Sequence, residues 1–193
     1  MRRLQRGKLT FPYKKAREGE MGWRGFTLVE LLVVLAVGSI LLAIAVPGYG
    51  FLTSTSRLAA VTNDLVTDLQ LARSEAVKRG MRVTVCKTGD AGAVPSACDA
   101  TANWHEGWLV FVDGGTPGVV DSGDVVLRVQ DTVNSAVIIT TGTNYSRYVS
   151  YLPTGRSQGL SLPNGTIQIC NSGNRRDIII NNTGRPRLLS GIC

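Results

Sequence analysis

Histidine and closely spaced cysteine pairs are almost absent from this chain, and their scarcity limits the chemistry that it can perform. The single histidine is His105, and none of the four cysteines form a Cys-x-x-Cys pair. Structural zinc sites use four Cys or His ligands that usually include such pairs. Zinc is therefore the less favoured interpretation of the cysteines, and we predict neither a metal site nor a cofactor.

A catalytic serine also lacks its partners. Gly155–Gly159 matches Gly-x-Ser-x-Gly, the nucleophile elbow, which requires a helix after the turn and a histidine later in the chain. The next residues, 160–165, read LSLPNG and cannot begin a helix, while His105 comes earlier. The sequence thus predicts that the protein is not an enzyme.

The acidic residues do not follow a calcium-binding spacing. Asp113, Asp121 and Asp124 could gather around Ca²⁺, which prefers oxygen ligands, but they do not match an EF-hand loop. The favoured interpretation is a solvated acidic hairpin loop.

Positive charge is present but unevenly placed. The formal net charge is +7; residues 1–25 contribute +6 of it, with eight Lys/Arg and two Glu. Residues 57–139 carry seven basic and ten acidic groups, a net −3, whereas residues 140–193 carry six Arg and one Asp, a net +5. The informative asymmetry is therefore the basic carboxy-terminal part of the chain.

The chain has one long apolar run, Phe26 to Val46, interrupted by a single charge, Glu30. As a helix these 21 residues span about 31 Å, the thickness of a bilayer core. A signal peptide has a shorter apolar region followed by small residues at the cleavage site. Basic residues flank only the amino-terminal side, which predicts that this side stays cytoplasmic, and Pro47 is expected to break or kink the helix.

The even cysteine count in a chain with an export signal favours two disulfides. Three pairings are possible. We favour Cys86–Cys98 and Cys170–Cys193, because each closes a short local loop.

Residues Gly25–Glu30 (GFTLVE) resemble the type III signal of type IV pilins and type II secretion pseudopilins. The resemblance implies cleavage after Gly25 by a prepilin peptidase and methylation of the new amino terminus at Phe26. It also implies that Glu30 and Pro47 serve assembly, since Glu30 can neutralise the Phe26 amine of a neighbouring subunit. Leaders in this family are usually shorter, so Met21 is an alternative start that would leave residues 1–20 outside the protein.

Beyond the apolar run the pattern predicts a second helical half and then strands. An apolar stripe and the terminating Gly80 predict a helix over residues 48–79. The stripe consists of Leu58, Leu65, Leu69, Ala72 and Ala76. Period-two alternation between turn signals then predicts an α+β fold with antiparallel sheet. The predicted strands are 81–86, 108–112, 125–129, 136–140, 145–152, 166–170 and 177–180.

The strand region resembles minor pilins of the FimT and GspH type, and FimT most closely, through Trp104–Asp113, Asp121–Val129 and Thr183–Arg187. The resemblance implies the type IV pilin fold, with a leader (1–25), a transmembrane and filament-core helix (26–47) and a periplasmic globular domain (48–193). It places the chain in the inner membrane and then in a pilus. The implied partners are other major and minor pilins, the prepilin peptidase and the inner membrane.

The basic tail is the candidate binding site. Gly184, Arg185 and Arg187 match the Gly-Arg-x-Arg that in FimT-like pilins is associated with DNA capture during natural transformation. In an extended segment the two arginines would project to one face, about 6.7 Å apart. Arginine binds phosphate without reading sequence. Aromatic residues among the arginines are limited to Tyr145, Tyr148 and Tyr151. Double-stranded DNA is therefore favoured over single strands, which need stacking partners. The other predicted contacts are Arg147, Arg156, Arg175 and Arg176.

The alternative is a GspH-like minor pseudopilin of the type II secretion system, a structural subunit without DNA binding. It shares the fold and the processing signal, so only the tail separates the two hypotheses.

Overall fold

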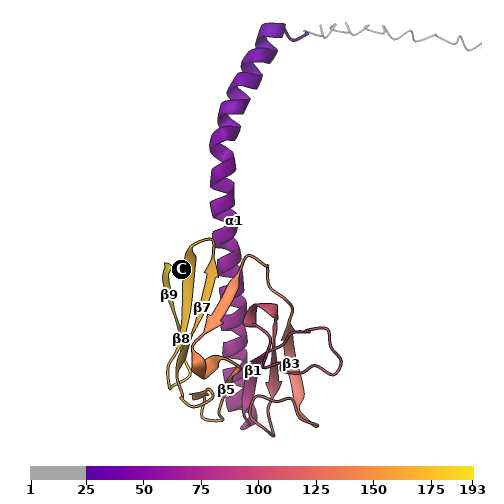
Figure 1. Ribbon diagram of the computed structural model, residues 1–193, viewed down its shortest axis with the longest axis vertical. Helices are drawn as coiled ribbons and strands as arrows, with labels where there is room; N and C mark the ends of the chain where they lie inside the picture. Colours follow the sequence, from indigo (N-terminus) through magenta and orange to yellow (C-terminus); the bar gives the residue numbers. More distant parts are fainter. Residues whose placement is uncertain (1–24) are drawn as a thin grey trace, which may run out of the picture. The chain divides into compact units, whose positions relative to one another are not determined.

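The computed structural model describes residues 25–193, without the side chains of residues 46–48 (Figure 1). The predicted leader, apart from Gly25, and the alternative start at Met21 lie outside the described residues. The chain divides into two units, the first ending at Ile44 and the second running from Ala45 to Cys193. Each unit is described by itself.

Helix α1 (Leu28–Arg79) contributes to both units. It begins at a capped end, because the Thr27 hydroxyl accepts a 3.2 Å hydrogen bond from the backbone N–H of Glu30. Its apolar first part is the one segment among the described residues that is long and apolar enough to cross a membrane. The helix does not break at Pro47: proline removes one backbone donor, and the remaining hydrogen bonds continue to Arg79.

The second unit has a helix between two sheets. The predicted stripe on α1 is confirmed, and its five residues are at most 2% exposed: Leu58, Leu65, Leu69, Ala72 and Ala76. Gly80 follows the helix with φ of 65°, as expected for a glycine cap. Figure 1 shows β7 to β9 on one side of this part of the helix, and β1 and β3 on the other.

The first sheet has five antiparallel strands in the order β3-β2-β1-β5-β6. Both faces of its centre are covered, because one face packs on α1 and the other forms a second cluster of Cys86, Leu109 and Phe111. Its strands are β1 (Val83–Lys87), β2 (Trp108–Val112), β3 (Val125–Gln130), β5 (Tyr148–Tyr151) and β6 (Ser157–Gln158).

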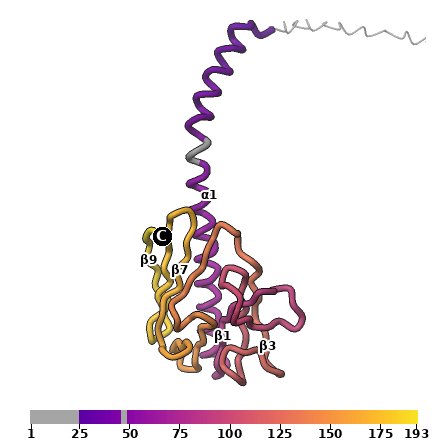
Figure 2. Tube along the Cα trace, in the orientation of Figure 1, coloured from indigo at the N-terminus to yellow at the C-terminus, as the bar shows by residue number. Residues whose placement is uncertain are grey.

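The second sheet has four antiparallel strands in the order β4-β7-β8-β9. Ile167, Ile169, Ile178 and Ile180 bury its inner face in the core that also contains the α1 stripe. In Figure 2 its last strand ends the chain at the sheet edge. Its strands are β4 (Ile138–Thr141), β7 (Gly165–Asn171), β8 (Asn174–Ile180) and β9 (Pro186–Ile192).

The predicted strands all exist; 108–112 has the predicted bounds, and the others have shifted ends. Two starts shift by three residues: the strand predicted at 177–180 begins at Asn174, and the one predicted at 145–152 begins at Tyr148, because Tyr145 belongs to a 3₁₀ turn, η2 (Thr143–Tyr145). A second such turn, η1 (Trp104–Glu106), precedes β2. The sequence did not predict β6 or β9. Strand β9 opens on Pro186, and proline is tolerated as the first residue of an edge strand.

Both disulfides join the predicted partners. Cys86 and Cys98 lie 5.7 Å apart at their Cα atoms, and Cys170 and Cys193 lie 6.0 Å apart. The second bond fastens the end of β9 to β7, across β8.

Both core clusters draw all their buried residues from the stretch between Leu58 and Ile180. A domain beginning at residue 53 therefore contains a complete core and is expected to fold without the apolar part of α1.

Candidate processing and nucleic-acid-binding sites

The predicted processing site precedes the first turn of α1. Gly25, Phe26 and Thr27 are not helical, and the Phe26 side chain is 79% exposed. The bond between Gly25 and Phe26 is therefore outside the helix and accessible. Glu30 lies in the first turn of α1, where a carboxylate suits the positive end of the helix dipole.

Two turns meet beside the carboxy-terminal end of α1, and together they build the basic site. One turn, residues 152–156, joins β5 to β6; the other, residues 181–185, joins β8 to β9. Arg73 of α1 binds both: its Nε donates to the carbonyl of Gly155 at 3.0 Å, and its Nη2 donates to the carbonyl of Thr183 at 3.2 Å. The helix therefore fixes the position of the predicted Gly-Arg-x-Arg segment.

Gly184 has a structural role in this arrangement. It is buried with φ of 75°, and an added Cβ would lie 2.2 Å from the carbonyl oxygen of Gly155. Only glycine combines this backbone conformation with so close an approach. Gly184 thus allows the two turns to lie in direct contact. Side-chain contacts with a ligand would come from the residues beside it.

The backbone of Arg185 is held in place by a hydrogen bond within the turn. Its backbone N–H donates to the side-chain oxygen of Asn181 at 3.1 Å, and its own side chain is exposed. Arg156 is fixed as well, since its guanidinium donates twice to the Asn182 side chain, at 2.7 and 3.0 Å. Arg156 and Arg185 thus emerge from adjoining turns.

Arg187 lies close in sequence but on another face. It pairs with Ile179, whose neighbours Ile178 and Ile180 are buried in the core. Since side chains alternate along a strand and opposed residues share a face, Arg187 lies on the outer face of the second sheet. Arg185 is not part of β9: it precedes the strand and lines a groove beside α1.

The other predicted arginines are not gathered here. Arg176 and Arg175 pair with Ser190 and Gly191. They lie four and five strand positions from Ile180 beside the turn, about 13 and 17 Å away. Arg175 also forms an ion pair with Asp177 at 3.2 Å. Arg147 immediately precedes β5 of the other sheet, at the strand end remote from the turn, where it lines a recess with the Cys98 loop.

A groove of about 720 Å³ runs between α1 and the start of β9. Its lining contains three cations and no carboxylate. The lining residues are Gln70, Arg73, Ser74, Val77, Lys78, Arg185 and Pro186. Sequence reasoning missed Arg73 and Lys78, although their spacing on one helix face with exposed Gln70 and Ser74 was a usable signal.

Carboxylates nearby are already engaged. Glu75 forms ion pairs with Lys78 and Arg79, and the hydrogen bond from Arg79 holds the pKa of Glu75 below its ordinary value. Among the described residues, no ion pair involves Arg73, Arg156, Arg185 or Arg187. The charge of these four arginines is therefore uncompensated by direct contacts.

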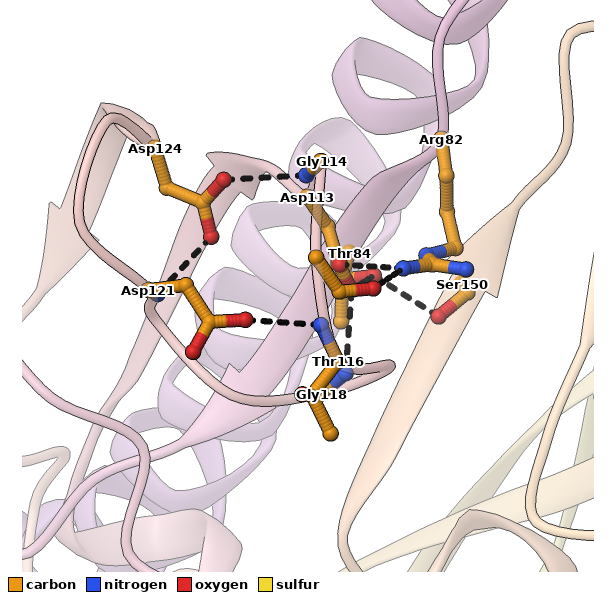
Figure 3. A network of polar contacts seen from close by, with 10 residues as sticks. Arg82, Thr84, Asp113, Gly114, Thr116, Gly118, Asp121, Asp124 and Ser150 are labelled. Carbon is orange, nitrogen blue, oxygen red and sulfur yellow. Dashed lines mark hydrogen bonds and ion pairs between the residues drawn. The ribbon is translucent and has the colours of Figure 1, made fainter.

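The acidic loop has a structural role. Asp113 is buried, pairs with Arg82 at 2.6 Å and accepts from Thr84 at 2.7 Å (Figure 3). Asp121 and Asp124 accept backbone N–H groups of the same loop at 2.7 to 2.9 Å. These carboxylates shape the connection between β2 and β3, and the described residues contain no group of three or more His, Cys, Asp or Glu suited to a metal.

The serine of the elbow-like sequence is part of the fold. Ser157 is buried in β6, with its hydroxyl within hydrogen-bonding distance of the carbonyls of Pro163 and Asn181. The turn carries no helix after it, so the geometry of a nucleophile elbow is not formed.

Comparison with known proteins agrees with this architecture. The family described as type II transport protein GspH matches residues 61–184, and the prokaryotic N-terminal methylation motif matches residues 24–46. The chain belongs to the GspH family. GspH-family chains are pilin-like subunits of type IV pili or type II secretion systems, and the methylation motif implies processing by prepilin peptidase and assembly with other pilins.

Solved structures show the same fold. This GspH-family chain resembles the type IV minor pilin FimU of Pseudomonas aeruginosa at a TM-score of 0.51 and 21% identity, covering 71% of this chain and 91% of FimU. It also matches the minor pseudopilin EpsH of the Vibrio cholerae type 2 secretion system, at a TM-score of 0.48 and 13% identity, over 69% of this chain and 97% of EpsH. A search of curated proteins gave no match.

The fold is thus the type IV pilin fold, with a long amino-terminal helix packed on antiparallel sheets.

Proposed function

We propose that this GspH-family subunit is a FimT-like minor pilin of a type IV pilus that binds DNA without sequence preference and supports natural transformation. The observation that carries the proposal is a group of exposed arginines, called here the turn arginines: Arg156 and Arg185 on the two turns, and Arg187 at the start of β9. None of the three has an ion-pair partner among the described residues.

Phosphate contacts explain why such a group suits DNA. One guanidinium group can donate two parallel hydrogen bonds to the oxygens of a phosphate. Contacts to phosphates do not depend on base sequence. Each neutralised phosphate releases counterions, so binding weakens with salt. Arg147, Arg175 and Arg176 were part of the predicted site; they lie elsewhere, and we assign the contact to the turn arginines.

In this proposal residues 1–25 are a leader that a prepilin peptidase removes after Gly25, and Phe26 becomes the methylated amino terminus. Residues 26–47 hold the subunit in the inner membrane and then in the filament core, with residues 48–193 in the periplasm. Glu30 pairs with the Phe26 amine of a neighbouring subunit, an interaction favoured because each charge is costly in an apolar surrounding.

The proposal is tested with the soluble domain, residues 53–193, and a short DNA duplex. We expect weak binding, with a dissociation constant of about 10⁻⁴ to 10⁻⁶ M, that falls steeply with salt and is indifferent to sequence. Absence of binding at low salt would refute the DNA function while leaving the pilin assignment intact.

The second candidate function is a GspH-like minor pseudopilin of the type II secretion system, and the family match over residues 61–184 favours it. Shearing pili from the cells and testing them for the chain distinguishes the two candidate functions. A pilus subunit is recovered with the filaments, whereas a pseudopilin remains with the secretion apparatus.

A further inference from the structure

We infer that the groove between α1 and the start of β9 is a phosphodiester-binding site, so that the DNA contact includes helix residues as well as the carboxy-terminal arginines. The inference rests on the proposed function and deepens it. Arg73 and Lys78 on one wall and Arg185 on the other bring three cations to a single groove.

The arginines retain free hydrogen-bond donors in the groove. A guanidinium carries five N–H donors, and the two hydrogen bonds of Arg73 to Gly155 and Thr183 leave others available. The Arg185 side chain has no hydrogen-bond or ion-pair partner among the described residues, although its backbone is held by Asn181. The side chain of Arg73 is thus fixed by its hydrogen bonds, whereas only the backbone of Arg185 is fixed.

The helix wall presents polar groups at regular intervals. Gln70, Ser74 and Lys78 are each four residues apart, which places them in one row with about 6 Å of axial rise between neighbours. All three are exposed. A row of donors with this repeat suits a ligand that is itself a repeating polyanion.

The groove also offers apolar surface. Val77 is 55% exposed and lies with Pro186 in the lining. A phosphodiester chain alternates charged phosphates with less polar sugars, so it can use both kinds of contact. The groove adjoins the turns that carry Arg156 and Arg185, and this continuity favours DNA over an acidic protein segment.

A charge inserted into the helix row tests the inference without altering the arginines. Ser74→Glu places a carboxylate four residues before Lys78, a spacing that supports the helix, and Ser74 is exposed. Thr67→Glu is the matched control: it adds the same charge at an exposed position of the same helix, outside the groove lining. Ser74→Lys is the reciprocal variant, because a misfolded domain cannot gain affinity.

Binding of the residue 53–193 domain to a fluorescent DNA duplex is measured by anisotropy over a series of salt concentrations. We expect Ser74→Glu to weaken binding about tenfold and to reduce the salt slope by about 0.9 for each phosphate that the variant no longer neutralises. Thr67→Glu should change affinity no more than about twofold, and Ser74→Lys should strengthen binding.

The outcomes separate the inference from the proposed function. If the wild-type domain binds no DNA, the proposed function fails, and the inference fails with it. If the domain binds DNA and Arg185→Ala/Arg187→Ala removes the binding, but Ser74→Glu behaves like Thr67→Glu, only the groove inference is overturned. Equal competition by a poly-glutamate peptide of matched charge would assign the groove to an acidic protein segment and would also overturn the inference.

Discussion

Arg73 donates a 3.0 Å hydrogen bond from its Nε to the carbonyl oxygen of Gly155, 82 residues away in sequence. The same guanidinium donates to the carbonyl of Thr183. One side chain of the helix thus fixes the two turns that carry the candidate DNA contacts. The stability of the domain and the geometry of the site therefore depend on the same residue.

Arg73→Lys preserves the positive charge but removes the planar guanidinium group, which donates both hydrogen bonds. A lysine ammonium cannot satisfy both carbonyls in the same geometry, so we expect a loss of about 1 kcal/mol in the free energy of unfolding. Urea denaturation of the residue 53–193 domain measures it. An unchanged midpoint would show that the two hydrogen bonds do not stabilise the turns.

Gly184→Ala is expected to be strongly destabilising. The left-handed conformation costs about 1 to 2 kcal/mol for alanine, and relief of the clash with the Gly155 oxygen adds about 1 to 3 kcal/mol. Gly173→Ala is the control, because Gly173 has φ of 83° but open space around an added Cβ. Equal losses in thermal unfolding for the two variants would contradict the close approach of the turns.

Each disulfide is expected to stabilise the domain. The loops closed by Cys86–Cys98 and Cys170–Cys193 span 12 and 23 residues, which corresponds to about 3 kcal/mol each in the chain-entropy account. We expect Cys170→Ser/Cys193→Ser to loosen β9 selectively, seen as faster amide exchange in β9 than in β1. Uniform exchange across both sheets would be inconsistent with that local effect.

Asp68 predicts a pH dependence of stability. Burial raises the pKa of Asp68 above its ordinary value, against the opposing hydrogen bond from Trp108 and the nearby charge of Arg128. The native state therefore holds this proton more tightly than the unfolded chain. The contribution of Asp68 to stability is present below the unfolded pKa and is lost as pH rises through the raised folded pKa.

Asp68→Asn removes this contribution, and its carbonyl can still accept from Trp108. The difference in the free energy of unfolding between wild type and Asp68→Asn, followed from acidic to neutral pH, is expected to shift in favour of the variant as pH rises. The control is Asp131→Asn, an exposed carboxylate, because the charge of Asp64 itself helps to raise the pKa of Asp68. A difference that does not vary with pH would rule out the raised pKa.

Local patterns predicted most of the fold. The α1 stripe and the seven strands were predictable because each depends on spacing that one segment reveals by itself. Strand β9 was not, since its first residue is a proline and its exposed leucines do not alternate with polar residues. Its place depends on pairing with β8 and on the disulfide to Cys170.

The candidate site was only partly predictable. The arginines could be identified, but their grouping depends on which sheet and which strand end carries each one. Arg147 therefore separates from Arg185 because it adjoins the other sheet, and Arg175 separates from it because of its register in β8. Arg73 escaped notice because its contacts with Gly155 and Thr183 join segments that are distant in sequence.

The central claim is that the turn arginines bind DNA, and one comparison tests it most directly. The salt-dependent affinity of the residue 53–193 domain for a DNA duplex is measured for wild type, for Arg185→Ala/Arg187→Ala, and for the charge-matched control Arg57→Ala/Arg147→Ala, whose arginines are exposed elsewhere. We predict that the first pair loses binding and its salt dependence, while the control retains both. Equal losses in the two double variants would contradict a localised site and leave only the general charge of the domain.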